Sequence, residues 1–446
     1  MHAEKYYRDR AAAQVTRVAM TPPADKNEAE IGIEGFRGVS LISLHSPFSI
    51  HSFAFASTIM TMSSPATPSL QIRADPALIE CGGTRNNSRT CSWNATGQYL
   101  ASGSSDKFAR LFTVDHVSAA ATVTASSSAA GGPTAAGTGR ELQALTGHTG
   151  SIDRVRFHPT EASVLCTASS DRSARLWDIR SAGTSRSGGK IDVGAGIVSV
   201  EWNSAQRGSV RHLVVCDRDD TVRVYDGRKL SKPVSAVFAF GDVVHETHFS
   251  PSGTHLVAGV KLKENGMGAL RAWKWDDGND APKGKAGKVM IGNDNIDTFV
   301  GHAGPLYTLK FSTEGERLAT GGHDALVSLW DVASMTSQAV VARRTKFIRS
   351  VSFSHDSRLV ATSSEEDGID VADAVTGERL GLVKLMTDDK ARIRERMGHA
   401  GVGGGADEIA FHPKAYVLAC ARGFSPGPPN GPAQTPQMSV ARLAVG

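Results

Sequence analysis

Short runs of alternating apolar and polar residues recur along most of the chain. In the stretch GGHDALVSLWDVAS, one side of an extended chain carries Leu326, Ser328 and Trp330, and the other side carries Val327 and Leu329. Alternation with a period of two is typical of a β-strand. Turn-forming groups such as Ser-Gly, Asn-Ala-Thr-Gly and Glu-Gly separate the runs. The pattern therefore predicts an all-β protein of many short strands.

The same unit recurs along the sequence. An acid stands six residues before an aromatic residue in the pairs Asp106–Phe112, Asp171–Trp177, Asp219–Tyr225 and Asp324–Trp330, and Glu366 stands six before Ala372. A second marker, an aromatic residue followed by a turn, occurs at Trp93, Phe157, Trp202, Phe249, Phe311, Phe353 and Phe411. Repeats of ~40–45 residues are typical of four-stranded propeller blades, which must stack to bury both faces. We therefore expect a seven-bladed β-propeller.

The units resemble WD repeats, with GH at Gly147-His148 and Gly301-His302 and WD at Trp177-Asp178 and Trp330-Asp331. In that family the histidine, a strand hydroxyl, the turn acid and the tryptophan form one hydrogen-bond network. The resemblance implies that the second blade uses His148, Ser169 (or Thr167), Asp171 and Trp177. It implies that the fifth blade uses His302, Asp324 and Trp330, with Thr320 or Gly322 at the hydroxyl position.

A Ser-His-Asp catalytic triad is the alternative interpretation of these side chains. A triad needs an exposed nucleophile beside an oxyanion hole, and an enzyme with one site has no reason to repeat the set in several blades. The histidines lack metal-ligand spacing, and the lysine-rich stretch at 278–288 misses the phosphate-loop pattern. We therefore predict a protein that is not an enzyme and binds no metal or cofactor.

Composition places few limits on function. The 446 residues are 40% hydrophobic and carry a formal net charge of +4, which predicts no strong overall attraction to nucleic acid or membranes. The five cysteines include no CxxC pair, so a reducing compartment fits best. The apolar run at 41–60 is interrupted by His, Ser and Pro, so we predict no membrane span.

We expect residues 1–68 to form a disordered leader, with Met60 or Met62 as an alternative natural start, and residues 69–446 to form the propeller. Four stretches are too rich in Gly, Ala, Ser, Pro or charge for strands and are expected to be insertions: 117–139, 276–297, 382–405 and 423–437. Ring closure stays open, because residues 70–80 could donate the last strand or 438–446 could supply it alone.

Two surface features are candidate interaction sites. The cluster Arg343, Arg344 and Lys346 could contact RNA phosphates, although no aromatic stacking platform accompanies it in the sequence. Asp178 and Arg180 form a WD-x-Arg end, which resembles the box by which some propellers dock onto the adaptor of a cullin ubiquitin ligase. Such ends are common in WD repeats, and Arg180 could simply end a strand.

The second half of the chain also resembles a narrower family, the third subunits of the THO complex, in their fungal form. The resemblance is carried by the segments 323–332, 347–380 and 408–421, where an I-D-V-A-D-A strand replaces the usual Trp-Asp strand of the sixth blade. It implies a nuclear, non-enzymatic scaffold that contacts other THO subunits. It also implies an indirect link to a DEAD-box RNA helicase and an mRNA export adaptor, and so a role in coupling transcription to mRNA processing and export.

Overall fold

The computed structural model describes residues 72–74, 79–80, 88–114, 139–180, 188–204, 212–237, 242–275, 296–385, 405–422 and 438–445. All of them belong to the unit that spans residues 66–446. The expected leader at 1–68 lies outside the described residues, as do almost all residues of the four expected insertions. The described part contains no helix with the length and apolar character of a membrane span.

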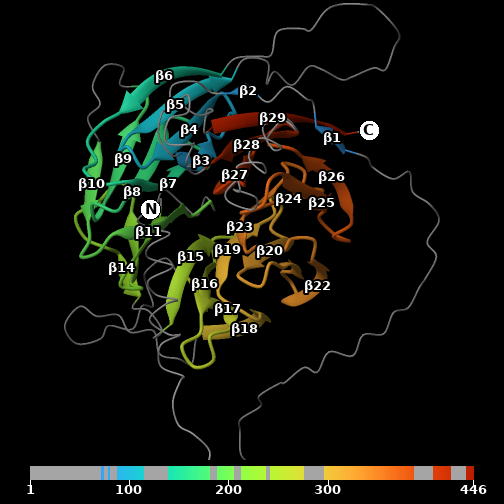
Figure 1. Cartoon of the computed structure of the whole chain (residues 1–446). Helices are drawn as coiled ribbons and strands as arrows, with labels where there is room; N and C mark the ends of the chain where they lie inside the picture. The colour runs from blue at the N-terminus through green and yellow to red at the C-terminus, as the bar shows by residue number, and fades with distance from the viewer. Residues whose placement is uncertain are drawn as a thin grey trace, which may run out of the picture. The chain divides into compact units, whose positions relative to one another are not determined.

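The described strands form seven antiparallel sheets arranged as the blades of a propeller (Figure 1). Blade I comprises β3 (Ser88–Trp93), β4 (Tyr99–Ser104), β5 (Ala109–Val114) and β6 (Gly139–Leu145). Blade II comprises β7 (Ile152–Phe157), β8 (Val164–Ser169), β9 (Ser173–Asp178) and β10 (Gly189–Asp192). Blade III comprises β11 (Ile197–Trp202), β12 (His212–Asp217), β13 (Val222–Asp226) and β14 (Ser235–Val237). The prediction of a seven-bladed β-propeller is confirmed.

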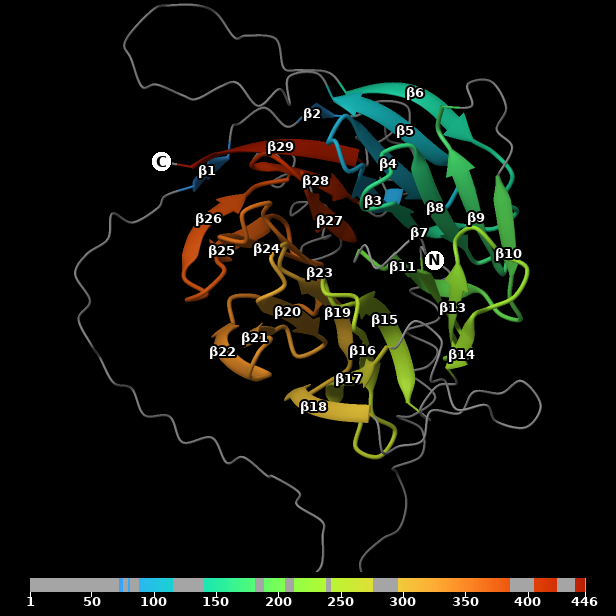
Figure 2. The ribbon, with the colours of Figure 1, turned by 180° about the vertical axis from the view of Figure 1, so that it is seen from behind.

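Blades IV to VI each contain four strands in chain order. Blade IV comprises β15 (Val243–Phe249), β16 (His255–Lys261), β17 (Gly268–Lys274) and β18 (Ile296–His302). Blade V comprises β19 (Leu306–Phe311), β20 (Arg317–Gly322), β21 (Val327–Asp331) and β22 (Thr336–Val341). Blade VI comprises β23 (Ile348–Phe353), β24 (Leu359–Ser364), β25 (Ile369–Asp373) and β26 (Arg379–Val383). The first strand of each blade is innermost and contacts the first strand of the next blade, as Figure 2 shows from behind.

Blade VII closes the ring with strands from both ends of the described chain. It contains β27 (Glu408–Phe411), β28 (Val417–Ala421) and β29 (Met438–Val445), and β29 pairs with β1 (Ile72–Ala74) and β2 (Ile79–Glu80). The inner strand β27 contacts β3 of blade I. Both segments that could have closed the ring therefore take part: β29 is the third strand of blade VII, and β1 and β2 pair with its outer edge.

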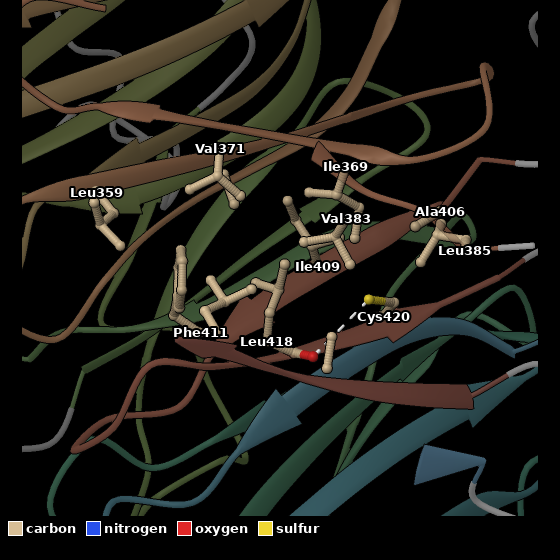
Figure 3. Close-up of a cluster of buried hydrophobic side chains, with 13 residues drawn as sticks. Leu359, Ile369, Val371, Val383, Leu385, Ala406, Ile409, Phe411, Leu418 and Cys420 are labelled. Atoms are coloured by element: carbon tan, nitrogen blue, oxygen red, sulfur yellow. Dashed lines mark hydrogen bonds between the residues drawn. The ribbon is translucent and has the colours of Figure 1, made fainter. Parts of the chain in front are cut away.

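The hydrophobic core is divided among the interfaces between blades. Seven clusters of buried residues in the described chain lie one at each interface. In the cluster between blades VI and VII, Leu359, Ile369 and Val371 face Ile409 and Leu418 (Figure 3). The seven marker aromatics fall in these clusters, and all except Phe311 are buried. Each blade therefore needs its neighbours to remove its apolar faces from water.

Candidate functional site

The polar network of blade II joins four elements around one hydroxyl. Thr167 Oγ1 on β8 lies 2.9 Å from Trp177 Nε1 and 2.7 Å from His148 Nε2. His148 Nδ1 lies 2.8 Å from Asp171 Oδ2, which also accepts the backbone N–H of Thr149 at 2.9 Å. Donation therefore runs from indole to hydroxyl to imidazole to carboxylate, and each buried polar atom has a partner.

Ser169, which the sequence placed at the hydroxyl position, lies elsewhere and does another job. Its Oγ accepts the backbone N–H of Asp171 at 3.1 Å and so caps the β8–β9 turn. The hydroxyl between Trp177 and His148 belongs to Thr167, two residues earlier. Side chains two residues apart on a strand lie on the same face of the sheet, so spacing alone did not separate the two roles.

Blade V repeats this arrangement. Thr320 Oγ1 lies 2.9 Å from Trp330 Nε1 and 2.8 Å from His302 Nε2, and His302 Nδ1 lies 3.1 Å from Asp324. Asp324 also accepts the backbone N–H of Ala303 at 3.0 Å. The strand position left open between Thr320 and Gly322 is thus occupied by the threonine.

Electrostatics keep the blade II network in one protonation state. Burial alone would raise the pKa of Asp171, but hydrogen bonds from Ser173, Thr149 and His148 outweigh it and lower this pKa to about 2. Burial lowers the pKa of His148 in spite of Asp171. At neutral pH a neutral imidazole therefore donates from Nδ1 to an ionised carboxylate. Because Thr167 and His148 are buried, no nucleophile of this set faces solvent.

In blades I, III and IV an arginine on the third strand pairs with an acid. Arg110 on β5 lies 2.6 Å from Asp106 in the preceding turn of blade I, and Arg271 on β17 lies 2.7 Å from Asp242 in blade IV. In blade III the pair is Arg223 on β13 and Asp217 at the end of β12, 2.5 Å apart. These pairs connect the third strand of a blade to a neighbouring turn, loop or strand.

Blade VI uses two of the candidate RNA-binding arginines in the same structural way. Arg343 lies 2.8 Å from Asp370, and the largely buried Arg344 donates to Gly368 O at 2.8 Å and lies 3.4 Å from Glu366. Lys346 is exposed, and no ion pair to it occurs among the described residues. The structure therefore pairs Arg343 and Arg344 with acids of blade VI and leaves Lys346 exposed beside them.

Asp178 and Arg180 lie at the exposed end of β9. Their side chains pair with each other at 2.5 Å, and the Arg180 backbone N–H also donates to Asp178 Oδ1. The hydrogen bond from Arg180 lowers the pKa of Asp178. Water and salt screen an exposed pair of this kind, so both side chains can change partner at little cost.

Near the start of six inner strands, one residue has no partner in the hydrogen-bond ladder to the next strand of its blade. Register shifts mark a β-bulge there in β3, β7, β11, β15, β19 and β23. A bulge re-aims the side chain of the extra residue. We call these the rim residues: Arg89, Asp153, Val198, His245, Tyr307 and Arg349.

The rim residues form two chemically different arcs. In blades I to III, Asp153 pairs with Arg89 at 3.0 Å and with Arg218 at 3.3 Å. In blades IV to VI, Tyr307 makes edge contacts, with ring centroids 5.1 to 6.1 Å apart, to His245, Phe347 and His323. The guanidinium of Arg349 covers Phe347 at 4.6 Å. The sequence analysis missed this aromatic arc because its members come from three blades.

A second set of charges crosses the ring between its inner strands. Arg156 Nη2 on β7 lies 2.6 Å from Glu408 on β27 and 3.6 Å from Glu246 on β15, and its Nε lies 2.9 Å from Glu201 on β11. Blades II, IV and VII are not neighbours, so these side chains meet across the axis of the ring. We call the six connected residues the axial network: Arg156, Glu201, Glu246, His248, Lys310 and Glu408.

The axial carboxylates are ionised although they are buried. Burial opposes ionisation of Glu201, but Lys310, His248 and Arg156 outweigh it and lower its pKa to about 2. Burial likewise opposes ionisation of Glu246 and Glu408. The hydrogen bond and charge of His248, with Lys310 and Arg154, lower the pKa of Glu246, and Arg156, Arg154 and Lys310 lower that of Glu408. Burial lowers the pKa of His248, and the neighbouring Lys310 adds to this effect. No group of three or more His, Cys, Asp or Glu with metal-site geometry occurs among the described residues.

The comparisons with known proteins agree with this architecture. The model of the "WD domain, G-beta repeat" matches residues 80–113, 139–178, 293–331 and 337–369. The chain is 27% identical over 298 residues to THO complex subunit 3 of Arabidopsis thaliana. The aligned part covers 67% of this chain and 80% of that protein. It is 26% identical over 275 residues to WD repeat-containing protein AAC3 of Dictyostelium discoideum, covering 61% and 52%.

A similarity to a G protein subunit is shorter. The chain is 24% identical over 227 residues to the guanine nucleotide-binding protein subunit beta of Zea mays, covering 50% of this chain and 54% of that protein. The repeat matches fall in blades I, II, V and VI, and the sheets between them follow the same strand order. The chain therefore carries WD40 repeats, folded into a seven-bladed propeller.

Proposed function

We propose that this chain is a non-enzymatic scaffold subunit of a THO-type complex in the nucleus, coupling transcription to mRNA processing and export through protein–protein contacts. The observation that carries the proposal is the length of one aligned region, which covers 80% of THO complex subunit 3. The similarities to the AAC3 protein and the G protein subunit cover 52% and 54% of those proteins. A similarity that extends over most of a relative supports a shared role better than a match of repeats alone.

The chemistry of the site supports a scaffold. The histidines, acids and threonines that could perform catalysis are buried in networks that hold strands together, and their hydrogen bonds are satisfied within the blade. A propeller offers its rim and its outer edges to other proteins, and here the aromatic arc around Tyr307 is rich in the residue types that dominate protein interfaces. Direct partners would be other THO subunits, with a DEAD-box helicase and an export adaptor reached through them.

Affinity purification of the tagged chain from its native cells, followed by mass spectrometry, tests the proposal. We expect the large helical THO subunits to be recovered in near-stoichiometric amounts, also after RNase treatment. Recovery without those subunits would contradict a THO role.

Two variants test the alternatives in the same purification. Loss of a cullin-ligase adaptor in Arg180→Ala, with no THO subunit recovered, would favour the ubiquitin-ligase receptor. RNA that is recovered directly and lost in Lys346→Glu would favour an RNA-binding propeller. RNA binding has less support here because Arg343 and Arg344 already pair with acids inside blade VI.

A further inference from the structure

A groove of about 490 Å³ opens between blades II and III, at the end of these blades remote from the rim residues. Figure 2 shows the strands that border it, β9, β10, β13 and β14. Its lining includes apolar side chains from both blades: Val164, Leu176, Trp177, Trp202 and Leu230. The volume lies within the ~300–1,000 Å³ of sites that hold small molecules or anchoring side chains.

Glycines and inward hydrogen bonds make the floor of this groove apolar. A side chain at Gly188 would meet only Leu176 O, at 3.8 Å, so open space stands where another residue would fill it. The indole N–H groups of Trp177 and Trp202 donate into the protein, to Thr167 Oγ1 at 2.9 Å and to Arg156 O at 3.2 Å. The tryptophans therefore present ring carbons, not N–H groups, to an incoming ligand.

Charged side chains surround this floor, and positive ones predominate. The groove is lined by Lys190, Arg228 and Asp178. Each of them pairs with a residue two positions away in sequence: Lys190 with Asp192 at 2.6 Å, Arg228 with Asp226 at 3.5 Å, and Asp178 with Arg180 at 2.5 Å. These exposed pairs contribute little, so their cations remain free to bind a new carboxylate. The adjoining exposed residues Lys229 and Lys232 add positive charge to the blade III side.

We propose that this groove docks a short acidic segment of a protein partner, with one bulky apolar side chain placed on the floor. The partner's carboxylates pair with Lys190 and Arg228, and its leucine or aromatic side chain packs on Leu176 and Leu230, beside the small part of each indole that reaches the groove. Single-stranded RNA fits less well, because the two indoles are almost wholly buried and expose too little ring surface for a base to stack on. The inference rests on the proposed scaffold role only in requiring a protein partner, whichever complex supplies it.

Fluorescence anisotropy with the purified full chain tests the proposal. The probe is a fluorescein-labelled peptide of sequence Asp-Glu-Leu-Trp-Glu-Asp, compared with one in which Ala-Ala replaces Leu-Trp and one in which lysines replace the acids. We expect saturable binding of the first peptide, at least tenfold weaker binding of the other two, and weaker binding as salt rises.

Paired variants assign the binding to the groove. Gly188→Leu fills the open space and is expected to weaken binding at least tenfold, whereas Gly194→Leu, in the same blade at a position with nothing within 4 Å, leaves it unchanged. Arg228→Glu is expected to weaken binding about tenfold and to flatten its salt dependence. The circular dichroism and melting temperature of each variant are compared with those of the parent chain.

Three results would overturn the proposal: no saturable binding of the acidic peptide, equal binding by Gly188→Leu and Gly194→Leu, or preference for a labelled uridine oligonucleotide that Gly188→Leu abolishes. Because these measurements use a purified chain and a synthetic peptide, they can succeed when no THO subunit is recovered from cells. They can also fail when THO subunits are recovered, so the two proposals are tested separately.

Discussion

Removing the central cation of the axial network should destabilise the propeller strongly. The Arg156 guanidinium is buried and lies within 3.6 Å of carboxylates from blades III, IV and VII. The variant Arg156→Met keeps an unbranched apolar stem but removes the guanidinium, which leaves Glu201, Glu246 and Glu408 facing one another with less compensating charge. Breaking a buried ion pair from one side costs about 3–5 kcal/mol, which is a large part of the ~5–15 kcal/mol that stabilises a typical domain.

The partner variant Glu408→Gln should cost less. It removes one charge, but its amide oxygen can still accept from Arg156, as Glu408 Oε1 does at 2.6 Å. The amide nitrogen then takes the place of Oε2, which accepts the backbone N–H of Cys91 at 3.2 Å. We expect a loss of about 1.5–3 kcal/mol, the range for hydrogen bonds to charged groups. In the double variant the losses should fall short of their sum by about 0.5–3 kcal/mol, because both changes disrupt the same interaction.

Urea unfolding followed by tryptophan fluorescence measures these losses, provided that the slope of free energy against urea is unchanged between variants. Arg180→Met is the matched control, since it removes an arginine paired to one acid at 2.5 Å on the exposed end of β9. It should leave the free energy of unfolding nearly unchanged, because water screens this pair. If Arg156→Met is no more destabilising than Arg180→Met, or if the two axial losses simply add, the axial network does not join the blades as the distances suggest.

Three further outcomes follow from the same contacts. The free energy of unfolding should fall as the pH falls below about 4.5, because the folded state depresses the pKa values of Glu201 and Asp171 to about 2. The stability that these ionised groups contribute is lost as they protonate, and urea unfolding at a series of acidic pH values measures the loss. Thr167→Val should cost about 1–3 kcal/mol by leaving an indole N–H and an imidazole nitrogen without a partner, and Ser169→Ala should cost less, as urea unfolding would measure. Arg344→Met should increase amide exchange at the blade VI turn after β24 while leaving blade II unchanged, as hydrogen exchange with mass spectrometry would report.

The number of blades could be predicted because each blade repeats a local pattern. An aromatic residue before a turn can be recognised from the sequence of a single strand, and seven such markers predicted seven sheets. The closing strand could not be chosen in advance, since residues 70–80 and 438–446 were both candidates. Only the pairing of β1 and β2 with β29 in blade VII shows that both segments contribute. The choice between Thr167 and Ser169 depended on which hydroxyl reaches the indole, and both spacings are compatible with a strand.

The axial network left a signal in the sequence that only the ring makes meaningful. Arg156, Glu201 and Lys310 each stand one residue before a marker aromatic, and Glu246 and Glu408 each stand three before one. On a strand these positions share a face opposite to the aromatic side chain. Charge on the inner face of an inner strand would be costly in an ordinary sheet. Here Arg156 and Lys310 lie among the three carboxylates because blades II, III, IV, V and VII converge on one axis, which no single repeat reveals.

Blade VI shows how far a repeat can change its chemistry without changing its structural role. It lacks the tryptophan of blades II and V, and Ala372 at that position is buried against blade V. Glu366 accepts the backbone N–H of Thr345 at 2.7 Å, as Asp171 accepts that of Thr149 at 2.9 Å, so the acid still anchors the segment before the inner strand. Arg344 then replaces the imidazole as the partner of that acid. The departure from Trp-Asp is therefore a substitution within the blade. Evidence for a particular partner has to come from surfaces that no blade needs for its own stability, such as the groove beside Gly188 and the aromatic arc around Tyr307.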